Sequence, residues 1–296
     1  MHILRKNEPM RLHTTFRVGG PADVYAEPED EWELRELLDT CEAAGTPYLL
    51  IGHGSNLLIG DGGFRGTVIC LGKAFSDITV DGEVITARAG ALLSAVANTA
   101  LEHGLTGMEF ASGIPGSVGG ALVMNAGAYG GEIRDILLSA DILEMDGSAD
   151  RTDADGLERG YRSSNITALG RTVLGASFRL KKGDPAEIEA KMKDLNGRRK
   201  EKQPLEYPSA GSTFKRPEGY FAGALIDEAG LRGLREGGAQ VSEKHCGFVV
   251  NTGGATAGDV RRLIATVQQA VYDNSGVRLE PEVRMLGFRE EDSFDQ

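Results

Sequence analysis

The chain has 296 residues, 41% of them hydrophobic and 26% charged, and its formal net charge is −12. This length accommodates two or three domains with a core that needs no cross-links, and the acidic balance argues against nucleic acid and anionic membranes as partners. The three cysteines form no CxxC pair, the first ten residues lack a signal-peptide core, and no apolar run reaches membrane-spanning length. We therefore expect a cytoplasmic protein without disulfides or a metal site.

Residues 1–74 are predicted to form a small α/β unit. Apolar residues at helical spacing, closed by Gly45, predict a helix over 31–44. A short buried strand over 48–51 runs directly into a turn with the sequence Gly-His-Gly-Ser-Asn. The other strands predicted for this unit lie over 22–26 and 67–71.

Residues 75–200 are predicted to form a second unit that is richer in strands. An Asp-Gly turn predicts a hairpin made of strands 78–80 and 84–89. The other elements predicted here are helices over 92–103 and 185–202 and strands over 136–145 and 172–180. A Gln-Pro pair directly after the last helix marks a plausible boundary.

Residues 201–296 are predicted to form a third unit. Thr256 and Asp259 have the spacing of a capping box, and the helix that follows them keeps one apolar face. A strand over 277–286 closes the chain, and this final strand can return to the first part of the fold.

The stretch 111–131 has seven glycines among 21 residues and no charge. Glycine allows positive φ angles and close approach of bare backbone to a ligand, at an entropic cost. A flexible linker would be polar, whereas apolar residues such as Ile114 and Leu122 are interleaved here. Because successive N–H groups in such turns form a nest for phosphate oxygens, we interpret the stretch as a buried loop around a phosphorylated cofactor. It matches neither standard nucleotide motif.

The turn over 52–58 offers two glycines and the side chains of Ser55 and Asn56 at the end of a predicted strand. It suits a pyrophosphate clamp or a simple tight turn, and taken alone it does not decide between them. Together with the later glycine stretch, the turn can hold one dinucleotide from both sides.

Ser212 precedes two cations, Lys215 and Arg216, and its surroundings do not match the nucleophile elbow of acyl-transfer enzymes. A serine near fixed cations can donate a proton, because the cations stabilise the oxygen anion left behind. The alternative is a helix-capping serine among surface charges. Histidines such as His53 and His245 show no metal-ligand spacing, and we expect them to be structural or polar loop contacts.

Two further segments carry charged residues of interest. Arg162 stands among hydroxyl side chains, where it can bind a carboxylate in bidentate fashion or form a structural ion pair. Glu282 is expected to share a strand face with Glu280 and Arg284. That pattern fits a binding site and is equally typical of a solvated strand edge.

Seven motifs follow one another along nearly the whole chain. They are TTFRVGGPAD at 14–23, IGHGSNLL at 51–58, SGIPGSVGGALVMNAGAYG at 112–130, GYRSSN at 160–165, AGSTFKRP at 210–217, VSEKHCGFVVN at 241–251 and LEPEVRMLG at 279–287. In this order they resemble the UDP-N-acetylenolpyruvoylglucosamine reductase family, flavoenzymes of bacterial peptidoglycan synthesis. Seven motifs in a shared order are far more specific than any one of them.

The resemblance implies an α+β fold in which two α/β subdomains, 1–74 and 75–200, bind FAD as in vanillyl-alcohol-type oxidases. An α/β substrate domain over 201–296 would follow. FAD would be non-covalent, NADPH would be the hydride donor, the substrate would be UDP-N-acetylglucosamine enolpyruvate, and the chain would be a monomer or weak dimer. The residues expected to bind FAD are Gly52, His53, Gly54, Ser55, Asn56, Leu57, Leu58, Gly113, Ile114, Pro115, Gly116, Ser117, Gly119, Gly120, Asn125, Gly127 and Arg284.

The same resemblance implies the roles of the catalytic residues. Reduced FAD would deliver hydride to the methylene carbon of the enolpyruvyl group, and the charge that develops at the substrate carboxylate must be held. Arg162 and Glu282 would bind and polarise this carboxylate, with Glu282 protonated or sharing a proton, and Ser212 would protonate the carbon that bears it. The residues expected to bind the UDP-sugar are Tyr129, Lys202, Lys215 and Arg216.

The segment 163–171 is short and contains no tyrosine, so the chain resembles the shorter branch of the family, which lacks a substrate-covering tyrosine loop. We expect residues 214–220 to take the place of that loop. Two other functions fit the sequence less well: a flavin oxidase of the same fold and a non-catalytic nucleotide-sugar binding module. The motifs at 210–217 and 279–284 speak against the oxidase, and two separate glycine loops speak against the module.

Overall fold

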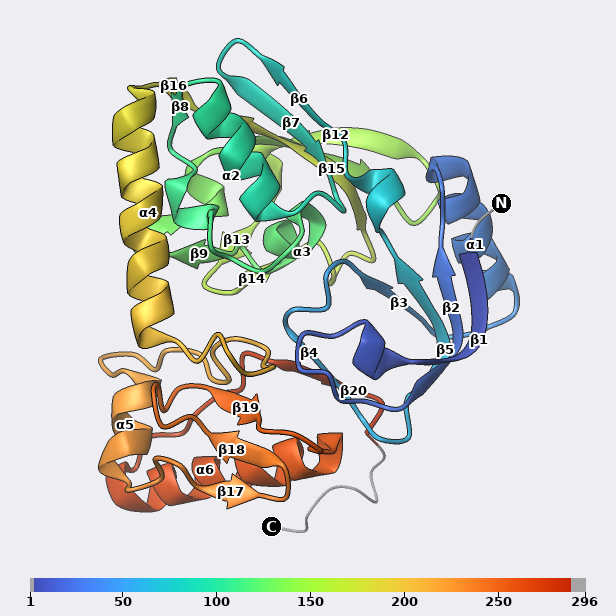
Figure 1. Ribbon diagram of the computed structural model, residues 1–296. Helices are drawn as coiled ribbons and strands as arrows, with labels where there is room; N and C mark the ends of the chain where they lie inside the picture. Colours follow the sequence, from blue (N-terminus) through green and yellow to red (C-terminus); the bar gives the residue numbers. More distant parts are fainter. Residues whose placement is uncertain (1–2, 289–296) are drawn as a thin grey trace. The chain divides into compact units, whose positions relative to one another are not determined.

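The computed structural model describes residues 3–288. The chain divides into two compact units, each assembled from three stretches of sequence (Figure 1). Over the described residues, unit 1 comprises 3–4, Ala26–His53 and Val68–Arg199, and unit 2 comprises Arg5–Tyr25, Gly54–Thr67 and 200–288. The three-domain boundaries expected from the sequence remain a prediction.

A four-stranded sheet has the order β1-β2-β5-β3, and the division of the chain falls within its first three strands. Its members are β1 (Ile3–Pro9), β2 (Pro21–Glu27), β3 (Tyr48–Ile51) and β5 (Phe64–Cys70). Helix α1 (Glu31–Ala43) follows β2, and the Asp30 side chain caps it by accepting the N–H of Glu33. The predicted helix and the strands predicted at 22–26 and 48–51 are confirmed, whereas the strand predicted at 67–71 begins earlier, at Phe64.

The main sheet of unit 1 has five strands in the order β12-β11-β15-β7-β6, all antiparallel to their neighbours. They are β6 (Ile78–Asp81), β7 (Val84–Arg88), β11 (Leu137–Leu143), β12 (Ala149–Asp153) and β15 (Thr172–Arg179). The predicted hairpin is confirmed as β6–β7. The central strand β15 is buried at every position except its last, because helices α2 (Leu93–Glu102) and α3 (Val118–Val123) pack on this sheet.

Short hairpins and one long helix complete unit 1. The hairpin strands are β9 (Gly127–Ala128) with β10 (Gly131–Glu132), and β13 (Arg159–Gly160) with β14 (Ser163–Ser164). Strand β8 (Leu105–Thr106) pairs with β16 (Lys181–Lys182), directly before helix α4 (Pro185–Lys202). The bounds of α4 agree with the helix predicted over 185–202, and the ion pair of Lys191 with the buried Glu109, 3.6 Å long, holds it to unit 1.

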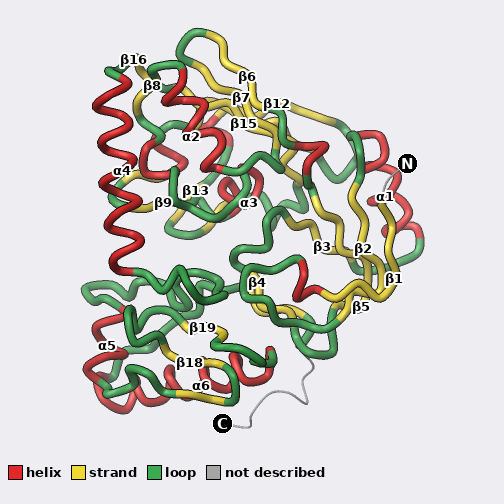
Figure 2. Tube along the Cα trace, in the orientation of Figure 1, coloured by secondary structure: helices red, strands yellow, loops and turns green. Residues whose placement is uncertain are grey.

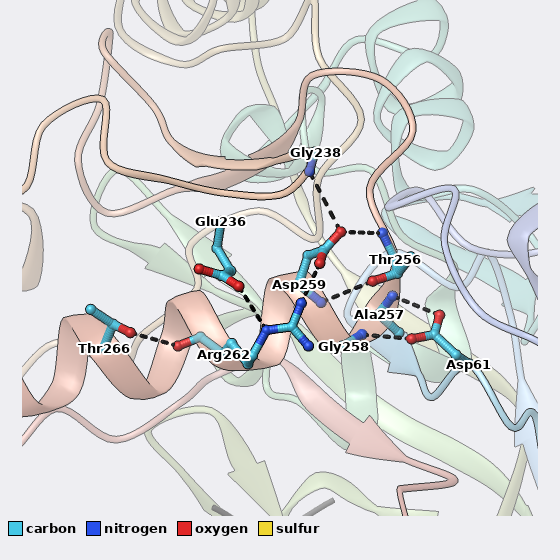
Figure 3. A network of polar contacts seen from close by, with 9 residues as sticks. All are labelled: Asp61, Glu236, Gly238, Thr256, Ala257, Gly258, Asp259, Arg262 and Thr266. Atoms are coloured by element: carbon cyan, nitrogen blue, oxygen red, sulfur yellow. Dashed lines mark hydrogen bonds and ion pairs between the residues drawn. The ribbon is translucent and has the colours of Figure 1, made fainter.

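Unit 2 is organised around helix α6 (Ala257–Ser275), which packs on the sheet β17-β18-β19 (Figure 2). The strands are β17 (Arg235–Glu236), β18 (Ala239–Val241) and β19 (Val249–Asn251), and helix α5 (Ala222–Glu228) also contacts α6. The predicted capping box is confirmed, because Thr256 accepts the N–H of Asp259 and Asp259 accepts the N–H of Thr256. Figure 3 shows a second carboxylate there: Asp61 accepts the N–H groups of Ala257 and Gly258, both at 2.8 Å.

The closing strand predicted over 277–286 is largely wrong. Only β20 (Arg284–Leu286) is a strand, and it pairs in parallel with β4 (Leu57–Ile59). Before it, Pro281 makes a single antiparallel bridge with Phe214. The sequence reading also missed the short elements α3, α5 and β12 and strand β1. Over residues 3–288, no helix is both long enough and apolar enough to cross a membrane.

Candidate active site

In unit 1, the Gly52 turn and the glycine stretch meet directly. A Cβ atom added at Gly52 would lie 1.9 Å from the Oγ atom of Ser117, whose side chain is buried. Glycine at position 52 is therefore required for these loops to close on each other. The structure thus brings together parts of the two loops that the sequence motifs assign to FAD.

Between Gly113 and Gly120, the amide groups of the glycine stretch fall into two classes. Those that donate to main-chain carbonyl oxygens belong to Ile114, Gly116, Val118 and Gly119. Those for which the described residues provide no acceptor belong to Gly113, Ser117 and Gly120. Pro115 has no N–H at all. The amides without an acceptor are therefore separated from one another and do not form the continuous run that the sequence suggested; a phosphate nest here stays a prediction.

Gly113 lies against helix α4. A Cβ atom at this position would lie 2.5 Å from Oδ1 of Asn196 and 3.0 Å from a guanidinium nitrogen of Arg199. Burial lowers the pKa of Arg199, and the nearby Tyr129 acts in the opposite direction. Arg199 thus places a cation beside the glycine stretch, which the sequence reading missed. In a helix as polar as α4, the helical period does not reveal which cation turns inward.

Asn125 is almost completely buried and ties three turns of unit 1 together. Its Nδ2 group donates to Oε2 of Glu132 at 2.9 Å and to the carbonyl oxygen of Gly160 at 3.1 Å, and its Oδ1 accepts the N–H of Arg134 at 3.0 Å. Both side-chain donors are thereby used inside the protein. The binding of Asn125 to FAD stays a prediction.

Arg162 occupies the turn of the β13–β14 hairpin. Its guanidinium donates to the carbonyl oxygen of Gly127 at 3.1 Å and lies 5.1 Å from the centre of the Tyr161 ring. Gly160, at the base of the same hairpin, accepts a hydrogen bond from Asn125. The hairpin is therefore tied on both sides to the segment that carries Gly127 and Tyr129.

Strained backbone conformations are concentrated in these turns of unit 1. Five non-glycine residues described here have positive φ angles, and three of them are predicted site residues: Asn125 (40°), Tyr129 (53°) and Arg162 (54°). Such conformations cost about 1–3 kcal/mol each and persist only where the surroundings enforce them. Tyr129 is 47% exposed at the tip of the β9–β10 hairpin, so its strain is enforced by the backbone and not by packing of its ring.

In unit 2, the Ser212 segment pairs with the Glu282 segment. The N–H of Glu282 donates to the carbonyl oxygen of Thr213 and the N–H of Lys215 donates to that of Glu280, both at 2.8 Å. These bonds flank the Phe214–Pro281 bridge. Pro281 therefore occupies a position that needs no N–H, and its missing donor costs nothing. The Ser212 side chain is exposed beside this pairing.

Glu282 is also held from the other side. The side-chain amide of Asn56 donates to the carbonyl oxygen of Glu282 at 3.0 Å, and the N–H of Arg284 donates to that of Asn56 at 3.0 Å. Leu58 has no exposed surface and belongs to the core of unit 2. The Leu58 side chain is thus a core contact and not a cofactor contact, and the Asn56 amide positions Glu282. In the same loop, Gly54 has a φ of 63°, and a Cβ atom there would lie 2.0 Å from the carbonyl oxygen of His13.

Of the cations predicted to bind the UDP-sugar, Arg216 lies against an exposed aromatic ring. Lys215 forms an ion pair with Glu280, and the guanidinium of Arg216 lies 4.0 Å from the centre of the Phe221 ring. Tyr220 and Phe221 are 48% and 62% exposed. Phe214 is 3% exposed in the core, so the expected covering segment 214–220 is wrong at its first residue. Lys202 is exposed at the end of α4.

His245 has the structural role that the sequence predicted. Its Nδ1 accepts the N–H of Gly247 at 3.1 Å, and its ring packs edge-on against Phe248. Burial lowers its pKa, which favours the neutral imidazole that this hydrogen bond requires. The loop shaped in this way presents the Gly247 carbonyl oxygen to the N–H of Thr213.

The predicted catalytic residues thus fall into two groups. Ser212 and Glu282 are brought together in unit 2, and Arg162 lies in unit 1 in the same hydrogen-bonded assembly as Tyr129, Gly127 and Asn125. Each group is internally consistent with the role expected from the sequence. Joint action of Arg162 with Ser212 and Glu282 stays a prediction.

Comparison with known proteins identifies the family. The chain is 56% identical over 296 residues to the UDP-N-acetylenolpyruvoylglucosamine reductase of Agathobacter rectalis, with 96% of this chain and 94% of that relative covered. The reductase of Clostridioides difficile is 51% identical over 284 residues, with 96% and 93% covered. The chain belongs to the UDP-N-acetylenolpyruvoylglucosamine reductase family.

Structure comparison agrees with this assignment. The crystal structure of the UDP-N-acetylenolpyruvylglucosamine reductase from Thermus caldophilus superimposes with a TM-score of 0.83 at 36% identity, covering 96% of this chain and 98% of that one. The FAD binding domain family model matches residues 22–153, and the C-terminal domain model of the reductase family matches residues 203–286. The expected fold class, an α+β FAD-binding fold with a C-terminal substrate domain, is therefore confirmed.

The two family matches cover different candidate site residues, and two residues lie outside both. Both glycine loops lie within the FAD-binding match, and Ser212, Lys215 and Glu282 lie within the C-terminal match. Arg162 and Arg199 fall between the two matches. A role of Arg162 in the site stays a prediction.

Proposed function

We propose that this protein reduces the enolpyruvyl group of UDP-N-acetylglucosamine enolpyruvate to give UDP-N-acetylmuramate, with NADPH as hydride donor and FAD as the bound carrier. The reaction supplies a peptidoglycan precursor. The observation that carries the proposal is the pairing of the Ser212 and Glu282 segments in unit 2, within the domain characteristic of the reductase family.

The chain's own groups suit a dinucleotide. A side chain at position 52 would collide with Ser117 and keep the two glycine loops apart, and the amides of Gly113, Ser117 and Gly120 suit phosphate oxygens. FAD held by these groups would supply the hydride chemistry that links NADPH to the methylene carbon of the enolpyruvyl group. A protein of net charge −12 needs local donors of this kind to hold an anionic ligand.

Three residues manage charge and protons at the substrate. Ser212, exposed beside the Thr213–Glu282 pairing, donates a proton to the carbon that bears the carboxylate. Arg162 binds that carboxylate and holds the charge that develops on it, and Glu282 polarises it in a protonated or proton-sharing state. Donors aimed at developing charge are usually the largest single catalytic contribution, which is why both are fixed by hydrogen bonds that do not depend on substrate.

The UDP part of the substrate is assigned to the cations of unit 2 and to Tyr129. Lys202, Lys215 and Arg216 contact the diphosphate, since phosphate oxygens favour such donors. The exposed Tyr220 and Phe221, next to Arg216, cover the uracil in place of the missing tyrosine loop. This assignment replaces the buried Phe214 as the covering ring.

The test uses the purified holoenzyme and its absorbance spectrum. A flavin spectrum that bleaches with NADPH and recovers anaerobically only after addition of the UDP-enolpyruvyl sugar supports the proposal. Rapid recovery with oxygen alone points to an oxidase. Ligand-induced thermal stabilisation without any flavin spectrum points to a binding module. Either of these two results rejects the reductase.

We further propose a cytoplasmic monomer or weak dimer. Nucleotide sugars and NADPH are intracellular metabolites, and this chemistry requires both. Light scattering over a range of protein concentrations measures the mass directly. A stable species of several 31.5 kDa chains at the lowest concentration contradicts the proposal.

A further inference from the structure

Thr213 connects three separate segments of unit 2. It is 2% exposed, and its Oγ1 accepts the N–H of Val249 at 2.9 Å. Its own N–H donates to the carbonyl oxygen of Gly247 at 2.8 Å, and its carbonyl oxygen accepts the N–H of Glu282 at 2.8 Å. One buried residue therefore fixes the Ser212 segment, the 247–249 segment and the Glu282 segment relative to one another.

Only one of these bonds depends on the side chain. Main-chain bonds persist with any residue at position 213, whereas the N–H of the buried Val249 needs the hydroxyl as its acceptor. A buried N–H left without a partner is costly, so the segments would shift to satisfy it elsewhere. Threonine also restricts χ1, which keeps the acceptor in place better than serine does.

Ser212 has few other restraints. Within residues 3–288, its hydroxyl makes no hydrogen bond, and its side chain is exposed. Gly211, directly before it, has a φ of 77° and no atom within 4 Å of where a Cβ would lie. The position of the Ser212 hydroxyl is therefore set mainly from its C-terminal side, at Thr213.

We propose that Thr213 is a positioning residue, whose hydrogen bond to Val249 aligns the Ser212 hydroxyl with Glu282 for protonation of the substrate. The inference rests on the proposed function, in which both residues act on the enolpyruvyl group. Thr213 itself touches neither substrate nor cofactor. Its effect is therefore confined to the step in which the substrate takes up hydride and a proton.

The test separates the two half-reactions by stopped-flow absorbance. In Thr213→Val, the flavin is reduced by NADPH within about twofold of the wild-type rate, while its reoxidation by the UDP-enolpyruvyl sugar slows ~10- to 100-fold, the scale of an ångström-sized misplacement. The substrate dissociation constant changes little. The solvent deuterium isotope effect on reoxidation rises, because proton delivery becomes slower. Thr213→Ser, which keeps the acceptor, restores most of the rate.

A matched control distinguishes positioning from general loss of stability. Thr256→Val removes another threonine oxygen that accepts a main-chain N–H in unit 2, at the start of α6 (Figure 3). This variant lowers the melting temperature and leaves both half-reactions unchanged. Amide exchange at Val249 is an independent readout, and it accelerates in Thr213→Val but not in Thr256→Val.

The outcomes are decisive in each direction. Reoxidation of Thr213→Val at the wild-type rate overturns the inference, as does equal slowing of reoxidation in Thr256→Val. Should the valine variant not fold, Thr213→Ala is measured in the same way and must show the same selective slowing. If the wild-type flavin is not reoxidised by the UDP-enolpyruvyl sugar at all, the proposed function fails and not the positioning role alone.

Discussion

The two units hold their predicted catalytic residues by different means. In unit 1, Arg162 and Tyr129 occupy hairpin turns with φ angles of 54° and 53°, and the side-chain amide of Asn125 ties the turns together. In unit 2, Ser212 and Glu282 are held by antiparallel main-chain pairing around Thr213. Over residues 200–288, no non-glycine residue has a positive φ.

The two sites therefore differ in the free energy needed to hold their backbone conformations. Strained residues cost about 1–3 kcal/mol each, so the hydrogen bonds around Asn125 must offset that cost and also fix the geometry. The pairing in unit 2 uses ordinary backbone conformations, and even Pro281 fits without losing a hydrogen bond. We therefore expect side-chain changes to affect stability and geometry together in unit 1, and to be separable in unit 2.

The largest expected effect is in unit 2. Ser212→Ala removes the proton donor without disturbing the Thr213 bonds, so reoxidation of reduced flavin by the UDP-enolpyruvyl sugar falls ~10²- to 10³-fold. Reduction of the flavin by NADPH keeps its rate, and thermal stability changes little because Ser212 is exposed. Ser275→Ala, near the end of α6, serves as the control. Full-rate reoxidation in Ser212→Ala contradicts the proton-donor role.

At Arg162, the difference in stability between an alanine and a glycine variant tests the contrast between the two units. Arg162→Ala and Arg162→Gly both lose the guanidinium, and reoxidation by the substrate falls ~10²-fold in each. The positive φ strains alanine but not glycine. The glycine variant is therefore more stable than the alanine variant by about 1 kcal/mol in urea unfolding. At Ser212, where φ is not positive, the order reverses and alanine is the more stable. The same order at both positions would remove the distinction between the units.

Asn125 tests whether hydrogen bonding, apart from strain, holds the unit 1 site. Asn125→Asp keeps shape and tolerance of positive φ but removes both donors and faces Glu132, so we expect destabilisation of about 2–4 kcal/mol. Reoxidation by the substrate also slows, since the hydrogen bond from residue 125 to Gly160 no longer anchors the Arg162 hairpin. Asn7→Asp is the control, an exposed asparagine with a φ of 54°. A small effect at Asn125, equal to that at Asn7, would contradict the anchoring role.

Local features of the fold could be predicted because their causes are local. The capping box of α6 lies within four residues, and α4 was bounded by a proline at its start and a Gln-Pro pair at its end. The strand predicted over 277–286 failed because most of this segment pairs only through the bridge of Pro281 with Phe214, a partner that no local pattern reveals.

The candidate site was likewise predictable only where its features depend on local sequence. The motifs located both glycine loops, but not the contact of Gly52 with Ser117, which depends on how the loops pack. Asn125 and Asn56 were assigned to FAD by the resemblance, but neither motif predicts that their side chains bond to Gly160 and Glu282. The role of Thr213 needs a partner in Val249, on another segment, and no spacing rule in the sequence connects the two.

The smallest expected effect is one of stability alone, and it lies in unit 2 away from Ser212 in the sequence. Burial opposes the charge of Asp259, but the N–H groups of Thr256 and Gly238 and the guanidinium of Arg262 outweigh it, so its pKa lies below the usual value (Figure 3). The folded state therefore binds this proton less readily than the unfolded state does. The resulting stabilisation is fully present above about pH 4 and is lost as the pH falls towards the lowered pKa.

Asp259→Asn should accordingly flatten the loss of stability below about pH 4, measured by urea unfolding between about pH 3 and 7. Above about pH 4 the substitution lowers the stability, because asparagine still caps the helix but lacks the charge that faces Arg262. Both half-reactions keep their rates. Asp273→Asn, an exposed carboxylate on the same helix, leaves the pH profile unchanged. Slower reoxidation in Asp259→Asn would mean that the start of α6 also governs the Thr213 pairing, and that stability and geometry in unit 2 are not separable.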